Sequence, residues 1–184
     1  MRDVTDSAKG SSEQFKQDIL QMFHFLRHPI DEVTKLPGWS IKRSLLWTGA
    51  CAMASGVLSG LLIANPFRVA QGLVLTPIVL VTMNVIMALF LYYLFQIFEK
   101  RTVEFTKLIE LNFFTNLPFF AFQIPSDLVP AFTILGFVFT GLLMIVGLVE
   151  NFKVERKRAI QLVVFIEVIV FIIWAWNRLS AYRG

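Results

Sequence analysis

Charged side chains are scarce in this chain of 184 residues. Asp, Glu, Lys and Arg make up 16% of it, whereas ordinary soluble domains contain roughly 25%. Hydrophobic residues make up 56%, and most of them lie in long runs between Ser44 and Leu179. A water-soluble core cannot bury so much apolar surface, so lipid is the expected solvent. The net charge of +4 comes from bases between these runs, not from a basic soluble face, so nucleic acid is not an expected partner.

Reactive side chains are also scarce. Cys51 is the single cysteine, which excludes an intrachain disulfide and leaves the redox compartment undetermined. The two histidines, His24 and His28, have no evident third ligand nearby, so no metal site is expected. The sequence contains no HExxH, no GxSxG and no phosphate-binding glycine loop. We therefore expect no catalytic residues, no cofactor and no enzymatic activity.

The apolar runs predict an all-α, polytopic membrane helix bundle. A helix needs about 20 mostly apolar residues to cross the hydrocarbon core. The third run is the weakest, because Glu104, Lys107 and Glu110 occupy its first turns, and a re-entrant segment there would leave four spans. Insertion is expected to use these helices, without a cleaved leader. The five predicted spans of the membrane domain, residues 44–184, are 44–64, 72–98, 103–124, 128–149 and 158–178.

The positions of the basic residues favour five spans and predict an orientation. With five spans, the N-terminal 43 residues, Lys100-Arg101 and the run 153–158 lie on one side of the membrane. The other side holds few bases, among them Arg68. Because bases in short loops stay cytoplasmic, the N-terminus is expected inside and the C-terminus outside.

The region before the first span predicts a different kind of helix. Residues 1–10 are expected to form a disordered tail, and residues 11–43 a cytoplasmic helix and a pre-membrane segment. The apolar residues of this helix recur at helical spacing, which predicts an amphipathic helix in the membrane interface. They are Phe15, Ile19, Met22, Phe23 and Leu26.

Four polar residues fall inside the predicted spans and form a candidate intramembrane cluster. Glu167 lies midway along the fifth span, where a charged carboxylate costs roughly 2.5–3.5 kcal/mol. It indicates either a proton-relay or ligand site, or a protonated acid bonded to a neighbouring helix through a group such as Asn84. Asn112 and Asn116 either line a polar cleft or bond neighbouring helices.

Two further patterns predict packing and lipid contacts. Ala52, Gly56 and Gly60 recur every four residues and include a GxxxG motif, which lets two helix backbones approach closely. The partner is either another span, which is favoured, or a second copy of the chain. The basic run after the fourth span is either a topology signal or a binding site for anionic headgroups. Its candidate headgroup contacts are Lys153, Arg156, Lys157 and Arg158.

Three segments resemble the Yip1 domain family. Phe25-Leu26-Arg27-His28-Pro29 with Trp39 is similar to the segment that precedes the family's first span. Phe105, Leu108 and Asn116-Leu117-Pro118 resemble its third span, which ends in a Leu-Pro step. Gly147-Leu148-Val149-Glu150, followed by Arg158-Ala159, resembles the exit from its fourth span and the entry to its fifth.

The resemblance implies a cytoplasmic N-terminus, five spans and a non-enzymatic scaffold or adaptor for membrane proteins or lipids. Eukaryotic members bind prenylated Rab-type GTPases, with a longer N-terminal region and a motif with tyrosine and glycine near the third span. Neither feature is present here, so GTPase binding is not expected. The short tail resembles that of bacterial members, which places the chain in the cytoplasmic (inner) membrane. The expected partners are the lipid bilayer and other membrane proteins or a second copy. The alternative function is a small transporter or channel built around Glu167.

Overall fold

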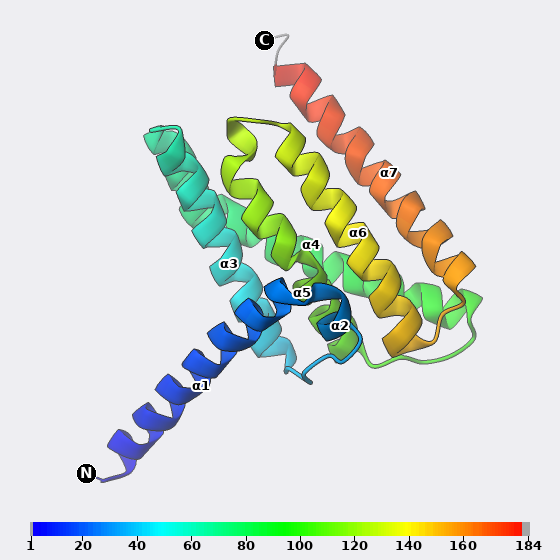
Figure 1. The fold of residues 1–184 in the computed structure, drawn as a ribbon, viewed down its shortest axis with the longest axis horizontal. Coiled ribbons are helices and arrows are strands. Elements are labelled where there is room, and N and C mark those ends of the chain that lie inside the picture. The colour runs from blue at the N-terminus through cyan, green and yellow to red at the C-terminus, as the bar shows by residue number, and fades with distance from the viewer. Residues whose placement is uncertain (1, 182–184) are drawn as a thin grey trace.

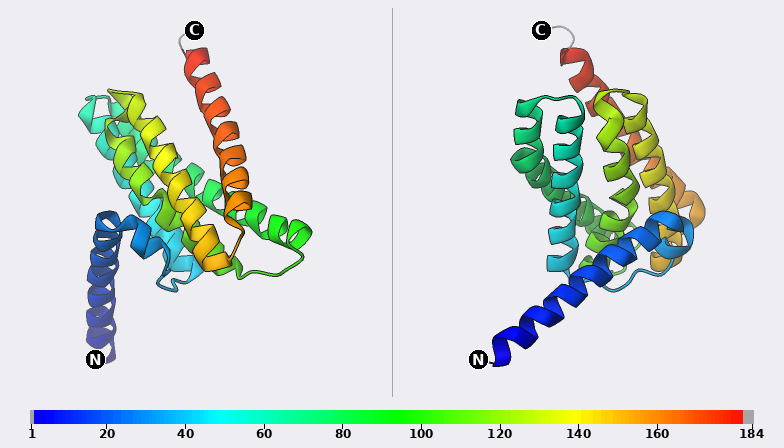
Figure 2. Two further views of the ribbon diagram at one scale, coloured as in Figure 1. Left: turned by 45° about the vertical axis from the view of Figure 1, so that its right-hand side comes forward. Right: turned by 60° about the vertical axis from the view of Figure 1, so that its left-hand side comes forward.

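The computed structural model describes the backbone of residues 2–181 and the side chains of residues 13–176. All regular structure in these residues is helical, which confirms the all-α class. The start of α1 and the end of α7 lie at opposite ends of the molecule (Figures 1 and 2). The elements are α1 (Arg2–Arg27), α2 (Pro29–Val33), α3 (Ile41–Leu62), α4 (Pro66–Phe98), α5 (Phe105–Gln123), the 3-10 turn η1 (Ile124–Asp127), α6 (Ala131–Phe152) and α7 (Arg156–Ala181).

The helix ends differ from the predicted boundaries by a few residues at most places. The largest differences are at α1, which begins at Arg2, and at α4, which begins at Pro66. Residues 2–10, predicted as a disordered tail, are thus part of α1, and no proline interrupts them. α4 starts early because Asn65 caps it: its side-chain oxygen accepts from the amides of Phe67 and Arg68.

Four helices are long and apolar enough to cross a membrane, namely α3, α4, α6 and α7. α5 does not meet that criterion in the described residues. It carries Lys107, Glu110, Asn112 and Asn116, which lower its hydropathy. The structure explains how these residues are tolerated: α5 packs against α3, α4 and α6 and is buried on most of its faces. A helix surrounded by protein can bond its polar groups to neighbouring helices, so it does not need an apolar surface.

Glycines bring α3 and α4 into close contact. A Cβ atom at Gly56 would lie 2.7 Å from the Cα of Gly72, and one at Gly60 would overlap the backbone of Val69. Ala52 is fully buried in the same helix. The small residues of the GxxxG pattern thus face another helix of this chain and leave no room for a side chain between the two backbones.

The C-terminal half of α1 is held to the bundle by buried polar contacts. Asp18 is 4% exposed and pairs with Arg43 of α3. The indole of Trp47 also donates to Asp18, over 2.6 Å. A buried carboxylate needs such partners, so these contacts fix α1 against the start of α3. In Figure 1 the N-terminal half of α1 extends away from the bundle.

Trp39 connects α1, the segment before α3, and α5. It is 1% exposed and packs on the rings of Phe113 and Phe114. Its indole donates to Gln21 over 2.9 Å, and its backbone amide donates to Glu110 over 2.7 Å. Glu110 therefore faces inward, whereas Lys107 and Glu104, the other charged residues at the start of this segment, form a 3.4 Å pair.

Candidate functional site

A chain of hydrogen bonds connects α3, α4 and α5 inside the bundle. The Asn84 side-chain amide donates to the Thr48 hydroxyl over 3.1 Å. The Asn112 amide donates to the backbone carbonyl of Asn84 over 3.2 Å, and the Asn116 amide donates to the carbonyl of Asn112 over 2.7 Å. Asn84 and Asn112 are 6% and 1% exposed, so these bonds satisfy groups that lipid could not. The sequence did not single out Thr48, because a threonine in a span has no distinctive spacing.

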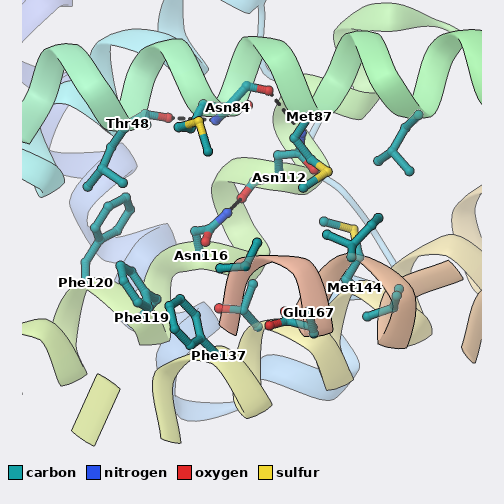
Figure 3. Close-up of a pocket in the computed structure, with 17 residues that line it drawn as sticks. Thr48, Asn84, Met87, Asn112, Asn116, Phe119, Phe120, Phe137, Met144 and Glu167 are labelled. Atoms are coloured by element: carbon teal, nitrogen blue, oxygen red, sulfur yellow. Dashed lines mark hydrogen bonds between the residues drawn. The ribbon is translucent and has the colours of Figure 1, made fainter. Parts of the chain in front are cut away.

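A cavity of about 180 Å³ lies beside this chain of bonds. α4, α5, α6 and α7 supply its walls, together with Thr48 of α3. All four residues of the predicted polar cluster line it, as Figure 3 shows. Most of the remaining lining is apolar and includes Met83, Met87, Met144, Phe119, Phe120 and Phe137.

Glu167 enters the cavity from α7 and is half-buried. Its carboxylate lies beside Gly141 of α6, where a Cβ atom would be 3.3 Å from Oε1. Among the described side chains it forms no hydrogen bond or ion pair. The predicted bond between Glu167 and Asn84 is absent from these residues, and the Asn84 amide nitrogen donates to Thr48. In the view of Figure 3, Asn112 and Asn116 lie between the two.

Several buried oxygens of the cavity lining lack a partner among the described residues. They are Oδ1 of Asn84, Oδ1 of Asn112 and the hydroxyl of Thr140. The bonds made by the two amide nitrogens fix which end of each asparagine is oxygen. These oxygens belong to residues that line the cavity, but each has almost no accessible surface of its own. Sequence reasoning missed Thr140 and Gly141, whose role depends on the position of α7.

The basic run after α6 is only partly free to bind headgroups. Arg158 donates to Glu99, the C-cap residue of α4, over 3.2 Å and lies 3.5 Å from Glu155. Lys153 is the C-cap of α6 and has a left-handed backbone with φ 52°. The side chains of Lys153, Arg156 and Lys157 are exposed.

The histidines lie apart from this cavity. His24 Nδ1 is 3.2 Å from a carboxylate oxygen of Glu32, and the His24 and His28 rings are 5.5 Å apart. The described residues contain no group of three or more potential ligands that could hold a metal ion.

The comparisons with known proteins give one result. No match is found among curated proteins or among solved structures. The family model of the Yip1 domain matches residues 23–177, from the last turns of α1 into α7. The match includes all three segments whose residues resemble the family, and it covers well over half of the sequence. Because of this match, together with an all-helical fold that contains four membrane-compatible helices, we assign the chain to the Yip1 domain family.

Proposed function

We propose that this Yip1-type membrane protein is a non-enzymatic scaffold or adaptor that organises membrane proteins or lipids. In this proposal the chain crosses the bacterial cytoplasmic membrane five times, with α5 as the third span. The N-terminus lies in the cytoplasm and the C-terminus outside. The positions of the bases support this arrangement. We do not extend GTPase binding to this chain.

The observation that carries the proposal is an uncovered apolar surface on α1. Leu20, Phe23 and Leu26 are 67%, 60% and 42% exposed, and we name them the α1 ridge. Asp18 and Gln21 hold the opposite side of the helix to the bundle, so the ridge has a fixed position. A rigid apolar surface of this kind indicates a contact with lipid or with another protein.

The α1 ridge continues into a groove on the bundle. Phe23 and Leu26 line an apolar groove of about 340 Å³ together with Leu58 of α3 and Leu117 of α5. Because Leu58 lies within a membrane-compatible helix, the groove would open to the hydrocarbon. An apolar helix or an acyl chain of a partner fits this position.

The double variant Leu20→Gln, Phe23→Gln is expected to lose its partners while the bundle stays folded. Burial of each side chain contributes about 1.5–3 kcal/mol, so association should weaken at least about tenfold. Affinity purification from native membranes after chemical crosslinking, with quantification of retained proteins and lipids, measures the change.

The matched control changes two exposed polar residues of the same helix, Lys16→Gln and Gln17→Ala. This variant should retain the wild-type set of partners. Equal retention by the ridge variant and the control would contradict the scaffold proposal.

The second candidate function is a small transporter or channel. The observation in its favour is that Asn84, Asn112, Asn116 and Glu167 line one cavity. A transporter needs this cavity to open to water, whereas a scaffold needs only paired polar groups between helices. Three of these residues belong to the chain of hydrogen bonds, which favours the scaffold.

Cysteine labelling distinguishes the two functions and tests the topology. In a Cys51→Ala background, a thiol introduced by Asn116→Cys is expected to react with a membrane-impermeant maleimide at least about tenfold more slowly than one at an exposed loop, because an apolar site disfavours the thiolate. The measurement is the labelling rate in intact cells and in inverted membrane vesicles.

Two exposed positions serve as references for the labelling. Lys157→Cys should react only in inverted vesicles, and Phe67→Cys only in intact cells. Fast labelling of Asn116→Cys from either side would favour transport. Labelling of both reference positions from one side would contradict the five-span arrangement.

A further inference from the structure

We propose that the cavity between α4, α5, α6 and α7 binds a small primary ammonium compound with an apolar body. Glu167 would receive its charge. This inference goes beyond the scaffold function and does not depend on it, because it requires only the cavity.

The polar side chains that line the cavity favour a ligand that donates hydrogen bonds. The side-chain oxygens of Asn84 and Asn112 are buried and have no partner among the described residues, while their amide nitrogens are already used by Thr48 and by a backbone carbonyl. Glu167 adds a carboxylate without a described partner. The carboxylate of Glu167 accepts hydrogen bonds, and an ammonium group carries three donors and no acceptor.

The charge of the ligand follows from the depth of Glu167. The described cations lie outside this cavity: Arg158, the nearest basic residue along α7, lies in the first turn of that helix and pairs with Glu99. A carboxylate within a membrane helix needs a counter-charge, which a bound cation would supply.

The apolar lining of the cavity makes a bare metal ion an unsuitable ligand. Hard cations take six or more oxygens, and the described residues hold no cluster of metal-ligating side chains. The walls consist instead of methionines and of the rings of Phe119, Phe120 and Phe137. Thioethers and ring faces contact apolar groups well, and ring faces also attract ammonium ions.

The size of the cavity limits the ligand. A cavity of about 150 Å³ holds a benzene ring. The cavity here is about 180 Å³, which suits one ring or a short branched chain with a small polar arm.

In this proposal the ligand enters between α4 and α7. These helices line opposite walls but do not pack directly against each other within the described residues. A separate hollow lies between the end of α4 and the start of α7, where Glu99 and Arg158 line it and pair with each other.

The test measures binding of 2-phenylethylamine, which is protonated at neutral pH, and of the neutral 2-phenylethanol. Titration calorimetry on the purified full-length protein in detergent micelles, with empty micelles subtracted, gives both Kd values. The amine is expected to bind at least about tenfold more tightly than the alcohol. Absence of saturable amine binding, as when water alone fills the cavity, or equal affinity for both compounds would overturn the proposal.

Three variants test the placement of the ligand. Glu167→Gln should remove the preference for the amine, and Val170→Phe should abolish binding of the amine by filling the cavity. Glu150→Gln, which removes an exposed carboxylate of α6 outside this cavity, should leave the affinity unchanged. Melting curves identify folded variants. A preference for the amine that persists in Glu167→Gln, or undiminished amine binding by folded Val170→Phe, would overturn the assignment.

Discussion

A Gly56→Ala variant is expected to lose about 3 kcal/mol of stability, at the upper end of the range for overpacking. The added Cβ would lie 2.7 Å from the Cα of Gly72 and 3.1 Å from the Thr76 hydroxyl. Because backbone atoms cannot rotate away as a side chain can, α3 and α4 must separate. The melting temperature of the protein in detergent should fall by roughly 5–10 °C.

Gly49→Ala is the matched control for this prediction. Gly49 lies on the same helix, but its added Cβ would be 3.5 Å from a methyl group of Val81, which is an ordinary contact. The substitution should leave the stability unchanged or raise it by up to about 1 kcal/mol, because alanine favours helix. If Gly56→Ala altered only the oligomeric state and not the melting temperature, the glycines would serve contacts between copies.

Trp39→Ala is expected to release α1 from the bundle and to cost about 3–5 kcal/mol. The fully buried indole packs on Phe113 and Phe114, and its N–H donates a hydrogen bond to the side chain of Gln21 in α1. The guanidinium of Arg43 also lies 4.3 Å above the indole ring. Without it, α1 loses the bond to Gln21 and keeps the contacts around Asp18 and the packing of Phe25 on Phe114. Limited trypsin digestion should then cleave after Lys16 and Arg27 much faster, while the melting temperature falls.

Trp39→Phe distinguishes ring packing from the hydrogen bond. Phenylalanine keeps an aromatic ring against Phe113 and Phe114 but cannot donate to Gln21, so the expected cost is only about 1 kcal/mol. The bond from the backbone amide of residue 39 to Glu110 is available in both variants. Trypsin resistance that is unchanged in Trp39→Ala would show that α1 does not depend on this contact.

The α1 region shows how far periodicity predicts contacts. The predicted apolar stripe placed Phe23 and Leu26 on the same face as Met22, which indicated one buried or interfacial surface. In the structure Met22 and Phe25 are buried, whereas Phe23 and Leu26 stay exposed. The stripe could not predict this division, because a polar residue outside it, Asp18, sets the rotation of α1 by bonding to Arg43 and Trp47.

The cavity depended on tertiary structure in a similar way. Glu167 was identified from the sequence because it lies midway along a predicted span. Asn112 and Asn116 were identified because they lie one helical turn apart in another predicted span. The alternatives of paired polar groups and a shared cavity remained open, because helix rotation decides which residues face each other. In the structure both are present: the asparagines bond between helices, and Glu167 meets them across a cavity.

The sequence by itself determined the helical class, the approximate helix positions and the family, because long apolar runs, prolines and basic loops act locally or at the level of whole segments. Only the tertiary structure decided that α5 is the protein-enclosed helix, that Gly56 faces Gly72, and that Glu110 bonds the backbone at Trp39. These facts depend on which helix faces pack together. Packing brings together residues that are far apart in the chain, and local sequence patterns do not show which of them will be in contact.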